Sequence, residues 1–424
     1  MDHFDLVDGE LHAEQVSLTA LAAEVGTPVY IYSTATLTRH YTVLREALDA
    51  HPSVLGDSLI AYAVKANSNL SVLATLARLG CGADTVSEGE IRRALKAGIP
   101  ADRIIFSGVG KTDAELAFAL QAGVRQINVE SVPELDRLAA IAAGLGVVAD
   151  IAIRVNPKIG AGGHAKITTG GEGDKFGVPA DEALDLYARA AASPHLNPVG
   201  LGCHIGSQIT DLTPLEGAFG LLRKLTETLR QQGLPVTRID LGGGLGVPYV
   251  GGAVTASPAD YAAMTARVLD GLDVEAAFEP GRLLAANAGI LLARVIQVTE
   301  RADGRRFLVL DAAMNDLLRP AMYDAFHEVK PVAPREGEPV AYDIVGPVCE
   351  TGDTFARGRL LPPIQAGDLV VFTGAGAYGA TMSSEYNSRP LVPEVLVDGE
   401  RWAVVRARPS YDEMLARETT ADWL

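Results

Sequence analysis

Short apolar runs alternate with amphipathic, alanine- and leucine-rich stretches from about Leu59 onwards, and this rhythm restricts the possible folds more than any other feature. Strands that are apolar throughout and separated by helices are typical of a parallel sheet covered on both faces. Eight such units predict a (β/α)8 barrel of the TIM type over residues 36–283, with an open doubly wound sheet as the alternative. The predicted strands are Leu59–Val64, Cys81–Val86, Ile104–Ser107, Gln126–Val129, Asp150–Val155, Val199–His204, Thr237–Leu241 and Val274–Glu279.

The rhythm changes after Leu283. Apolar runs are then separated by Gly, Pro and Asp turns with little helical periodicity between them, which is typical of antiparallel strands. A chain of 424 residues has room for a barrel of roughly 250 residues and a second domain. We therefore expect a mostly antiparallel β-sandwich or β-barrel domain over residues 284–424. An N-terminal segment, residues 1–35, contains the strand-like Val29–Tyr32 and is expected to pair with that domain.

Composition narrows the classes of function. The formal net charge of −17 disfavours nucleic acid and anionic membranes as partners. No apolar run approaches the ~20 residues that span a bilayer, and Met1–Glu10 lacks the order of a signal peptide. Three scattered cysteines do not make a disulfide framework, so a cytoplasmic location is expected. The histidines and cysteines lack the spacing of a metal site, and no metal is expected.

Polar side chains stand at the ends of the predicted barrel strands. Because the active site of such a barrel lies at the C-terminal edge of its strands, these side chains are predicted to converge. They are Lys65, Asp84, Glu130, Arg154, His204 and Glu279. Lys65 closes a buried strand, where desolvation opposes its charge and favours an amine nucleophile that can attack an aldehyde. A lysine that simply reaches solvent is the alternative.

Other segments suit an anionic or aromatic ligand. The glycine-rich loop at Gly242–Gly244 follows a predicted strand and could bind a phosphate through backbone N–H groups, or could be a tight turn. In Glu279–Arg282 a carboxylate could keep a pyridine nitrogen protonated, and the arginine could bind a carboxylate; a local ion pair is the alternative. In the β domain, Cys349 could donate a proton and Tyr378 lies in a glycine-rich turn, with an inert thiol and a plain hairpin as alternatives.

Together these segments resemble the fold-type III pyridoxal-phosphate (PLP) decarboxylases, and among them the diaminopimelate decarboxylases, over nearly the whole chain. Tyr62–Asn67 is similar to the family's cofactor-lysine motif, and Cys203–Gln208 to the segment whose His stacks on the pyridine ring and whose Ser reaches the phosphate. Met314–Tyr323 and Cys349–Asp353 are similar to the substrate segment and the Cys-Glu segment of the diaminopimelate enzymes. Several motifs in a fixed order make this resemblance specific, although none is specific alone.

The resemblance implies a role for each candidate residue. Lys65 would hold PLP covalently and Cys349 would donate a proton, which makes these two the expected catalytic residues. Further cofactor contacts are expected from Asp84, Arg154, His204, Ser207, Gly243, Gly244, Glu279, Pro280, Gly281, Arg282 and Tyr378. Substrate contacts are expected from Arg282, Arg319, Tyr323, Glu350 and Tyr378.

The activity that the resemblance implies is decarboxylation of meso-2,6-diaminopimelate to L-lysine, by a homodimer whose Cys-Glu segments complete each other's active sites. Another decarboxylase of this fold, acting on ornithine, lysine or a carrier-bound amino acid, is the nearest alternative. Glu350 and Arg319 disfavour it because they suit a second amine and a second carboxylate. A PLP racemase is disfavoured by Glu279, which would protonate the pyridine. A non-catalytic PLP-binding protein would not need Cys349 and Tyr378.

Overall fold

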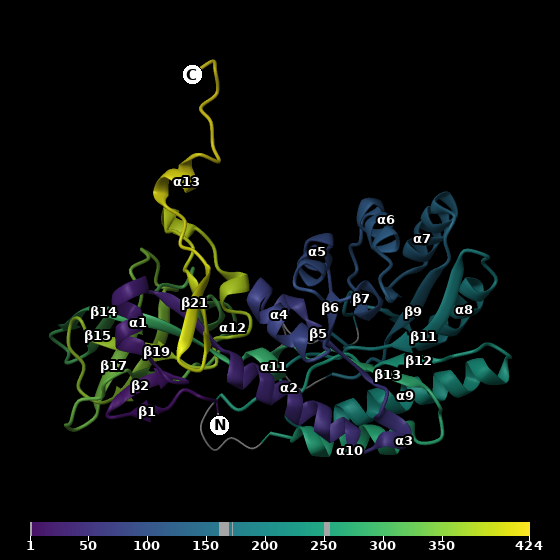
Figure 1. Ribbon diagram of the computed structural model, residues 1–424, viewed down its shortest axis with the longest axis horizontal. Helices are drawn as coiled ribbons and strands as arrows, with labels where there is room; N and C mark the ends of the chain where they lie inside the picture. Colours follow the sequence, from purple (N-terminus) through teal and green to yellow (C-terminus); the bar gives the residue numbers. More distant parts are fainter. Residues whose placement is uncertain (1, 161–168, 172, 250–254) are drawn as a thin grey trace. The chain divides into compact units, whose positions relative to one another are not determined.

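The computed structural model describes residues 2–160, 169–171, 173–249 and 255–424, and it divides into two compact units. One unit, a parallel barrel, is formed by the chain between Thr38 and Leu284. The other combines the N-terminal residues up to Leu37 with Tyr249 and with Ala285–Leu424, and consists mainly of β-strands (Figure 1). We call them the barrel unit and the β unit.

The barrel closes through parallel strand pairs alone. Neighbouring strands follow the order β5-β6-β7-β8-β9-β11-β12-β13, and the ring closes where β13 pairs with β5. This closure confirms the predicted (β/α)8 barrel and excludes the open sheet. The strands of the ring are β5 (Leu59–Ala63), β6 (Gly82–Thr85), β7 (Ile104–Phe106), β8 (Gln126–Val129), β9 (Ala149–Asn156), β11 (Leu196–Gly202), β12 (Arg238–Asp240) and β13 (Glu275–Phe278). The short β10 (Val178–Pro179) adds to β9 outside the ring.

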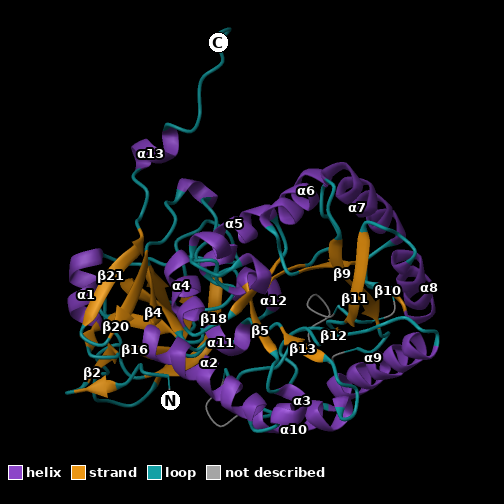
Figure 2. Cartoon of the chain, turned by 45° about the vertical axis from the view of Figure 1, so that its right-hand side comes forward, coloured by secondary structure: helices purple, strands orange, loops and turns teal. Residues whose placement is uncertain are grey.

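Helices surround these strands (Figure 2). Their starts follow from capping side chains: Ser87, Thr112 and Ser131 each accept a backbone N–H three residues later, and each begins a helix. The barrel helices are α3 (Pro52–Leu55), α4 (Leu70–Arg78), α5 (Glu88–Lys96), α6 (Asp113–Ala122), α7 (Val132–Leu145), α8 (Ala180–Ala191), α9 (Thr213–Gln231) and α10 (Pro258–Leu269), with α2 (Thr34–Asp49) and α11 (Arg282–Ala285) at the two ends of the unit.

The β unit is built on one mostly antiparallel sheet, as the sequence predicts. Its path runs β18-β17-β15-β14-β4-β20-β21, and β19 joins β14 to β16. The pairs β15–β17 and β4–β20 are parallel. Its strands are β4 (Val29–Ser33), β14 (Gly289–Glu300), β15 (Arg306–Leu310), β16 (Val329–Pro331), β17 (Val340–Val345), β18 (Thr354–Leu361), β19 (Leu369–Phe372), β20 (Glu394–Asp398) and β21 (Arg401–Arg406). A small sheet is formed by β1 (Leu6–Val7), β2 (Glu10–Ala13) and β3 (Val16–Ser17).

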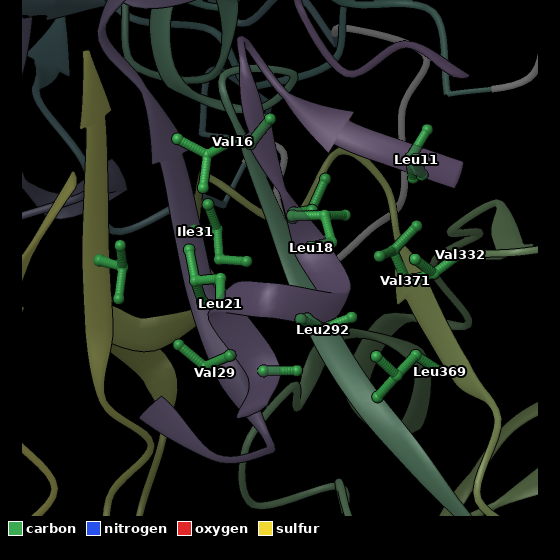
Figure 3. Close-up of a cluster of buried hydrophobic side chains, with 14 of the residues drawn as sticks. Leu11, Val16, Leu18, Leu21, Val29, Ile31, Leu292, Val332, Leu369 and Val371 are labelled. Atoms are coloured by element: carbon green, nitrogen blue, oxygen red, sulfur yellow. The ribbon is translucent and has the colours of Figure 1, made fainter. Parts of the chain in front are cut away.

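The N-terminal segment belongs to the core of this unit. Strand β4 lies between β14 and β20, and helix α1 (Leu18–Val25) packs Leu18 and Leu21 against Ile31 and Leu292 (Figure 3). Burying an aliphatic side chain of this size stabilises a fold by about 1.5–3 kcal/mol. The first residues of the chain and its last third therefore form one folded body.

Two further features concern the helices and the cysteines. Within the described ranges, no helix is long and apolar enough to cross a membrane. The three cysteines are free thiols, of which Cys81 and Cys203 are buried and Cys349 is exposed.

Candidate active site

A cavity of about 250 Å³ opens in the barrel unit at the C-terminal ends of its strands. Four of the residues predicted at strand ends line it: Lys65, Arg154, His204 and Glu279. The convergence expected from the barrel geometry is therefore present. The remaining lining residues are Val86, Ser107, Gly108, Asn128, Thr169, Phe176, Gly202, Cys203 and Asp240.

Lys65 is held by a buried carboxylate. It lies in a short 3-10 turn, Val64–Ala66, directly after β5. Its Nζ is 2.5 Å from Oδ2 of Asp84 on the neighbouring β6, and the Lys65 side chain is 37% exposed whereas that of Asp84 is fully buried. The other carboxylate oxygen of Asp84 is also buried and has no hydrogen-bond partner among the described residues. The amine is thus anchored at the cavity yet accessible from it.

Glu279 ends the last strand of the barrel next to another acid, Asp240. Asp240 accepts hydrogen bonds from the Asn128 side chain, at 2.7 Å, and from the Gly242 N–H, at 3.0 Å. Both of its oxygens thus accept hydrogen bonds within the barrel unit. Burial, Asp240 and Asp84 together raise the pKa of Glu279 well above its usual range.

One oxygen of Glu279 is buried without a hydrogen-bond partner in the part of the chain that the structure describes. A buried acceptor in that condition costs about 1–3 kcal/mol relative to a satisfied one. Glu279 therefore suits a ligand that brings an N–H group to this position.

His204 contributes a neutral ring to the cavity. Burial and the positive charges of Arg154 and Lys65 lower the pKa of His204 well below its usual range. Its Nδ1 lies 3.1 Å from the backbone N of Gly243, which can only donate, so the ring proton is on Nε2. The ring is consequently fixed by the glycine loop, and a flat neutral surface is what it offers a ligand.

The glycine loop permits close backbone contact. A Cβ at Gly243 would overlap the carbonyl oxygen of Glu279. Gly244 has a φ of +110°, and a Cβ on it would lie only 2.5 Å from the carbonyl oxygen of Gly206. The sequence predicts that both glycines bind a phosphate. In the structure, the N–H of Gly243 is engaged by His204.

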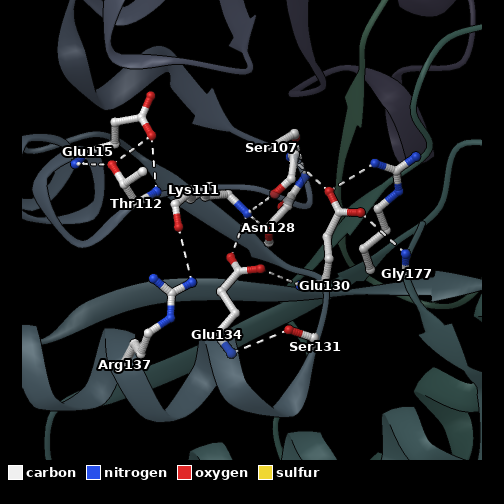
Figure 4. Close-up of polar contacts among 12 residues, drawn as sticks. Ser107, Lys111, Thr112, Glu115, Asn128, Glu130, Ser131, Glu134, Arg137 and Gly177 are labelled. Atoms are coloured by element: carbon white, nitrogen blue, oxygen red, sulfur yellow. Dashed lines mark hydrogen bonds and ion pairs between the residues drawn. The ribbon is translucent and has the colours of Figure 1, made fainter. Parts of the chain in front are cut away.

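Arg154 is positioned by a network of buried charged groups. Figure 4 shows three of its members, Glu130, Glu134 and Lys111. The Arg154 Nη1 is 3.0 Å from Oε1 of Glu130, which also accepts the N–H of Gly108 at 2.8 Å. Glu134 accepts the backbone N–H of Glu130 at 3.2 Å and pairs with Lys111 at 2.5 Å. Lys111 donates further to the carbonyl oxygens of Gly108 and Asn128, both at 2.7 Å. All three of its N–H donors thus have acceptors, which makes this network rigid.

The turn after β13 connects the remaining predicted cofactor residues. The Ser207 hydroxyl lies 3.2 Å from both Nε and Nη2 of Arg282, which is buried. The carbonyl oxygen of Pro280 accepts the N–H of Ala63 at 3.1 Å, and that of Gly281 accepts the N–H of Leu284 at 3.2 Å. Arg282 is therefore bonded to the segment that follows β11.

The other predicted residues belong to the β unit. Arg319 begins the short helix α12 (Arg319–Tyr323) and is buried, and Tyr323, which ends that helix, is half-buried. Tyr378 is also half-buried and has a φ of +56°, a backbone conformation that an aromatic residue rarely adopts and that is often found at functional sites.

Cys349 and Glu350 lie on an exposed turn after β17. The Cys349 Sγ accepts from the Asn387 side chain at 3.6 Å, and Glu350 accepts from the Tyr386 hydroxyl at 3.0 Å. Buried Asp353 closes the turn by accepting the N–H of Val348 at 2.7 Å.

The same Asp353 accepts the N–H of Met314, also at 2.7 Å. Met314 opens the segment that leads to Arg319 and Tyr323. The substrate segment and the Cys-Glu segment, far apart in the sequence, are thus brought together in the β unit, and a cavity of about 390 Å³ is lined by residues of both, including Pro320 and Gly352.

Sequence reasoning missed several supporting residues, namely Lys111, Asn128, Asp240, His327 and Asp353. Asp240 could have been found, because it stands at a strand end directly before the glycine loop. Lys111 and His327 lie in irregular segments, where periodicity gives no signal. Their partners are distant in sequence, so only the folded chain reveals them.

Comparisons with known proteins agree with this geometry. Residues 40–286 match the family described as pyridoxal-dependent decarboxylase, pyridoxal binding domain. Diaminopimelate decarboxylase of Zymomonas mobilis is 48% identical over 99% of this chain and 99% of its own length.

Two similar crystal structures contain L-lysine. That of diaminopimelate decarboxylase from Helicobacter pylori has a TM-score of 0.90 and 41% identity, and covers 94% of this chain and 98% of its own. That of the M. jannaschii enzyme has a TM-score of 0.95 and 33% identity, and covers 100% and 99%. The match thus extends through both units, and the chain belongs to the diaminopimelate decarboxylase family of pyridoxal-dependent decarboxylases.

Proposed function

We propose that this chain catalyses the PLP-dependent decarboxylation of meso-2,6-diaminopimelate to L-lysine and CO₂. The observation that carries the proposal is 48% identity to a diaminopimelate decarboxylase over 99% of both chains, because this match includes the β unit with its substrate and Cys-Glu segments. A resemblance limited to the barrel would indicate only the shared cofactor chemistry.

The barrel cavity fits PLP by the chemistry of its donors. Lys65 offers an amine for the aldehyde carbon, His204 offers a neutral ring face, and Glu279 offers a buried oxygen that lacks a partner within the described residues. Gly244, Ser207 and Arg282 are the proposed phosphate neighbours, together with Gly243, Pro280 and Gly281. When bound, PLP supplies a ring that accepts the electron pair left behind as CO₂ departs.

The protein's own groups would then direct the reaction. Glu279 holds a proton on the pyridine nitrogen, and the nearby acids Asp240 and Asp84 favour positive charge there. Asp84 orients the Lys65 amine, the group that would hold the cofactor covalently. Arg154, fixed by Glu130, closes the cavity on another side.

In the β unit, the Cys349 thiol donates the proton that replaces CO₂ on the α-carbon. The guanidinium of Arg319, with Tyr323, Tyr378 and Arg282, binds the carboxylate that the product retains. Glu350 binds the distal amine, so that the substrate presents one of its two amino-acid ends to the cofactor.

We further propose a homodimer in which the Cys349–Glu350 turn of one chain completes the site of its partner, acting in the cytoplasm. Exposed apolar side chains in the β unit support an interface: Phe326 is 40% exposed beside the Pro320–Gly352 cavity, and Trp423, on a tail that runs away from the sheet, is 84% exposed (Figure 1). Three free thiols support a reducing compartment.

Release of CO₂ from meso-, LL- and DD-diaminopimelate, ornithine and lysine tests the function directly. We expect meso-diaminopimelate to be turned over at least ~100-fold faster, in kcat/KM, than ornithine or lysine, because these lack the carboxylate that Arg319 binds, and a lost charged contact of this kind costs about 3 kcal/mol. Faster turnover of ornithine would assign the chain to another branch of the fold. Sedimentation of the active protein as a monomer would overturn the shared site.

A further inference from the structure

The buried guanidinium of Arg319 has an unusual setting. Its Nη1 lies 2.9 Å from Nε2 of His327, and its Cζ lies 5.1 Å from the centroid of the Tyr249 ring. The rings of Tyr249 and His327 meet edge to face at 5.7 Å. Two aromatic rings therefore contact this cation.

Hydrogen-bond chemistry defines the state of His327. A guanidinium can only donate, so Nε2 of His327 must be the acceptor and carries no proton. The ring proton is then on Nδ1, which lies 2.9 Å from the carbonyl oxygen of Thr373, a group that can only accept. The contact with Arg319 thus excludes the imidazolium, and the contact with Thr373 accounts for the single remaining ring proton.

The backbone fixes His327 as firmly as the ring contacts do. His327 comes just before β16, which pairs with β19 in the register Val329↔Phe372. The N–H of Thr373 donates to Glu328 O at 2.9 Å, and Arg359 donates to the carbonyl oxygen of His327 at 3.1 Å. The ring is buried, and its rotation away from Arg319 would break its hydrogen bond to the Thr373 carbonyl oxygen.

We propose that His327 is a positioning residue that determines preference for ligands with a carboxylate. It orients the Arg319 guanidinium through a neutral acceptor, so this contact does not reduce the positive charge that the arginine offers the ligand. An acid in the same place would orient the arginine equally well but would cancel that charge. This inference rests on the proposed role of Arg319 and deepens it.

Two ligands that differ by one carboxylate test the proposal on the PLP-loaded protein. Isothermal titration calorimetry would give the Kd of L-lysine, which has a carboxylate, and of 1,5-diaminopentane, which lacks it. The variants are H327Q, whose side-chain oxygen can accept from Arg319, and H327E, which has nearly the same shape with a negative charge. H195Q, at a half-buried histidine of the barrel unit, is the matched control.

In H327E we expect the Kd of L-lysine to rise at least ~10-fold, because a charge-assisted contact of about 1.4 kcal/mol or more is lost. The Kd of 1,5-diaminopentane should change less than ~2-fold. H327Q should stay within ~3-fold of the wild type for both ligands, as should H195Q. Equal weakening of both ligands in H327E, or unchanged affinity for L-lysine, would overturn the proposal. So would H327Q and H327E behaving alike.

Folding and function are separated by further readouts. H327L removes the acceptor altogether, and its circular dichroism and PLP content show whether the sheet edge survives; the isosteric Gln/Glu pair decides the question if it does not. Because binding is measured without turnover, a wild type that bound L-lysine but failed to decarboxylate diaminopimelate would disprove the proposed function and leave the role of His327 open to the same measurement.

Discussion

The barrel cavity and the substrate and Cys-Glu segments of the β unit differ in how their charged groups are compensated. In the barrel, three acids, Asp84, Asp240 and Glu279, crowd around one lysine, and burial and mutual repulsion raise the pKa of Glu279. In the β unit, Cys349 and Glu350 are exposed, and the buried Arg319 is oriented by a neutral histidine.

This difference indicates which kind of ligand each region suits. The barrel brings buried acids together and so raises the pKa of Glu279, an effect that a ring with a protonated nitrogen would oppose, and its site therefore suits a resident cofactor. The β unit has Cys349 and Glu350 on an accessible turn and orients Arg319 through a neutral ring, which suits a ligand that must enter and leave at every turnover.

Removing the barrel's lysine should have the largest effect. Lys65→Ala takes away the amine that carries the cofactor, and we expect decarboxylation to fall by at least ~10⁴-fold, because the cofactor loses both its attachment and its route of product release. The measurements are the initial rate and the visible absorbance of bound PLP. Lys96→Ala, at an exposed lysine on α5, should change neither. If K65A kept wild-type turnover, the cavity would not be the cofactor site.

Next in size is the exposed thiol. Cys349→Ala should lower kcat by about 10²–10³-fold with PLP still bound, because a positioned proton donor contributes on this scale. Burial raises the pKa of both Cys81 and Cys203 to about 12, so these two should resist alkylation.

Mass spectrometry after brief iodoacetamide treatment therefore should find one modified cysteine per chain, in parallel with loss of activity. C349A should take up none. Loss of PLP from C349A, rather than loss of rate, would show that the β unit supports the cofactor structurally and would weaken the contrast between the two regions.

The contrast between the regions also marks where sequence reasoning succeeded. The barrel and its strand-end residues followed from periodicity, because each apolar strand must point its C-terminal end to the same edge. Lys65, Arg154, His204 and Glu279 could thus be grouped from the sequence alone. In the β unit the sequence pattern predicted strands. The link between Met314 and the Cys349 turn, however, depends on hydrogen bonds to Asp353, and no local sequence pattern predicts such a long-range contact.

The buried network behind Arg154 should be important for stability. Lys111→Met leaves Glu134 as a buried acid without its cation and should lower the free energy of unfolding by about 3 kcal/mol. The double variant K111M/E134Q should recover a large part of this loss, since no unpaired charge remains. Urea denaturation of the PLP-free protein would measure both. If the single and double variants were equally unstable, packing rather than charge would explain the effect.

The smallest predicted effect is the most diagnostic, because one substitution at Glu279 should raise stability while it lowers activity. The pKa of Glu279 in the folded chain is raised above the ordinary value of 4.5, so the folded state binds more protons than the unfolded state between these two values. Its contribution to stability is therefore full below pH 4.5 and is lost as the pH rises through the folded pKa.

Glu279→Gln removes this loss of stability at high pH while keeping the shape of the side chain. The PLP-free variant should be more stable than the wild type by about 1–3 kcal/mol at about pH 8, with the difference shrinking towards about pH 5, whereas its decarboxylation falls at least ~10-fold. Glu300→Gln, at an exposed glutamate, is the control. Thermal unfolding across this pH range measures the difference in stability between the variant and the wild type. A difference that does not depend on pH, or a less stable variant, would mean that the barrel's acids do not destabilise one another before the cofactor binds.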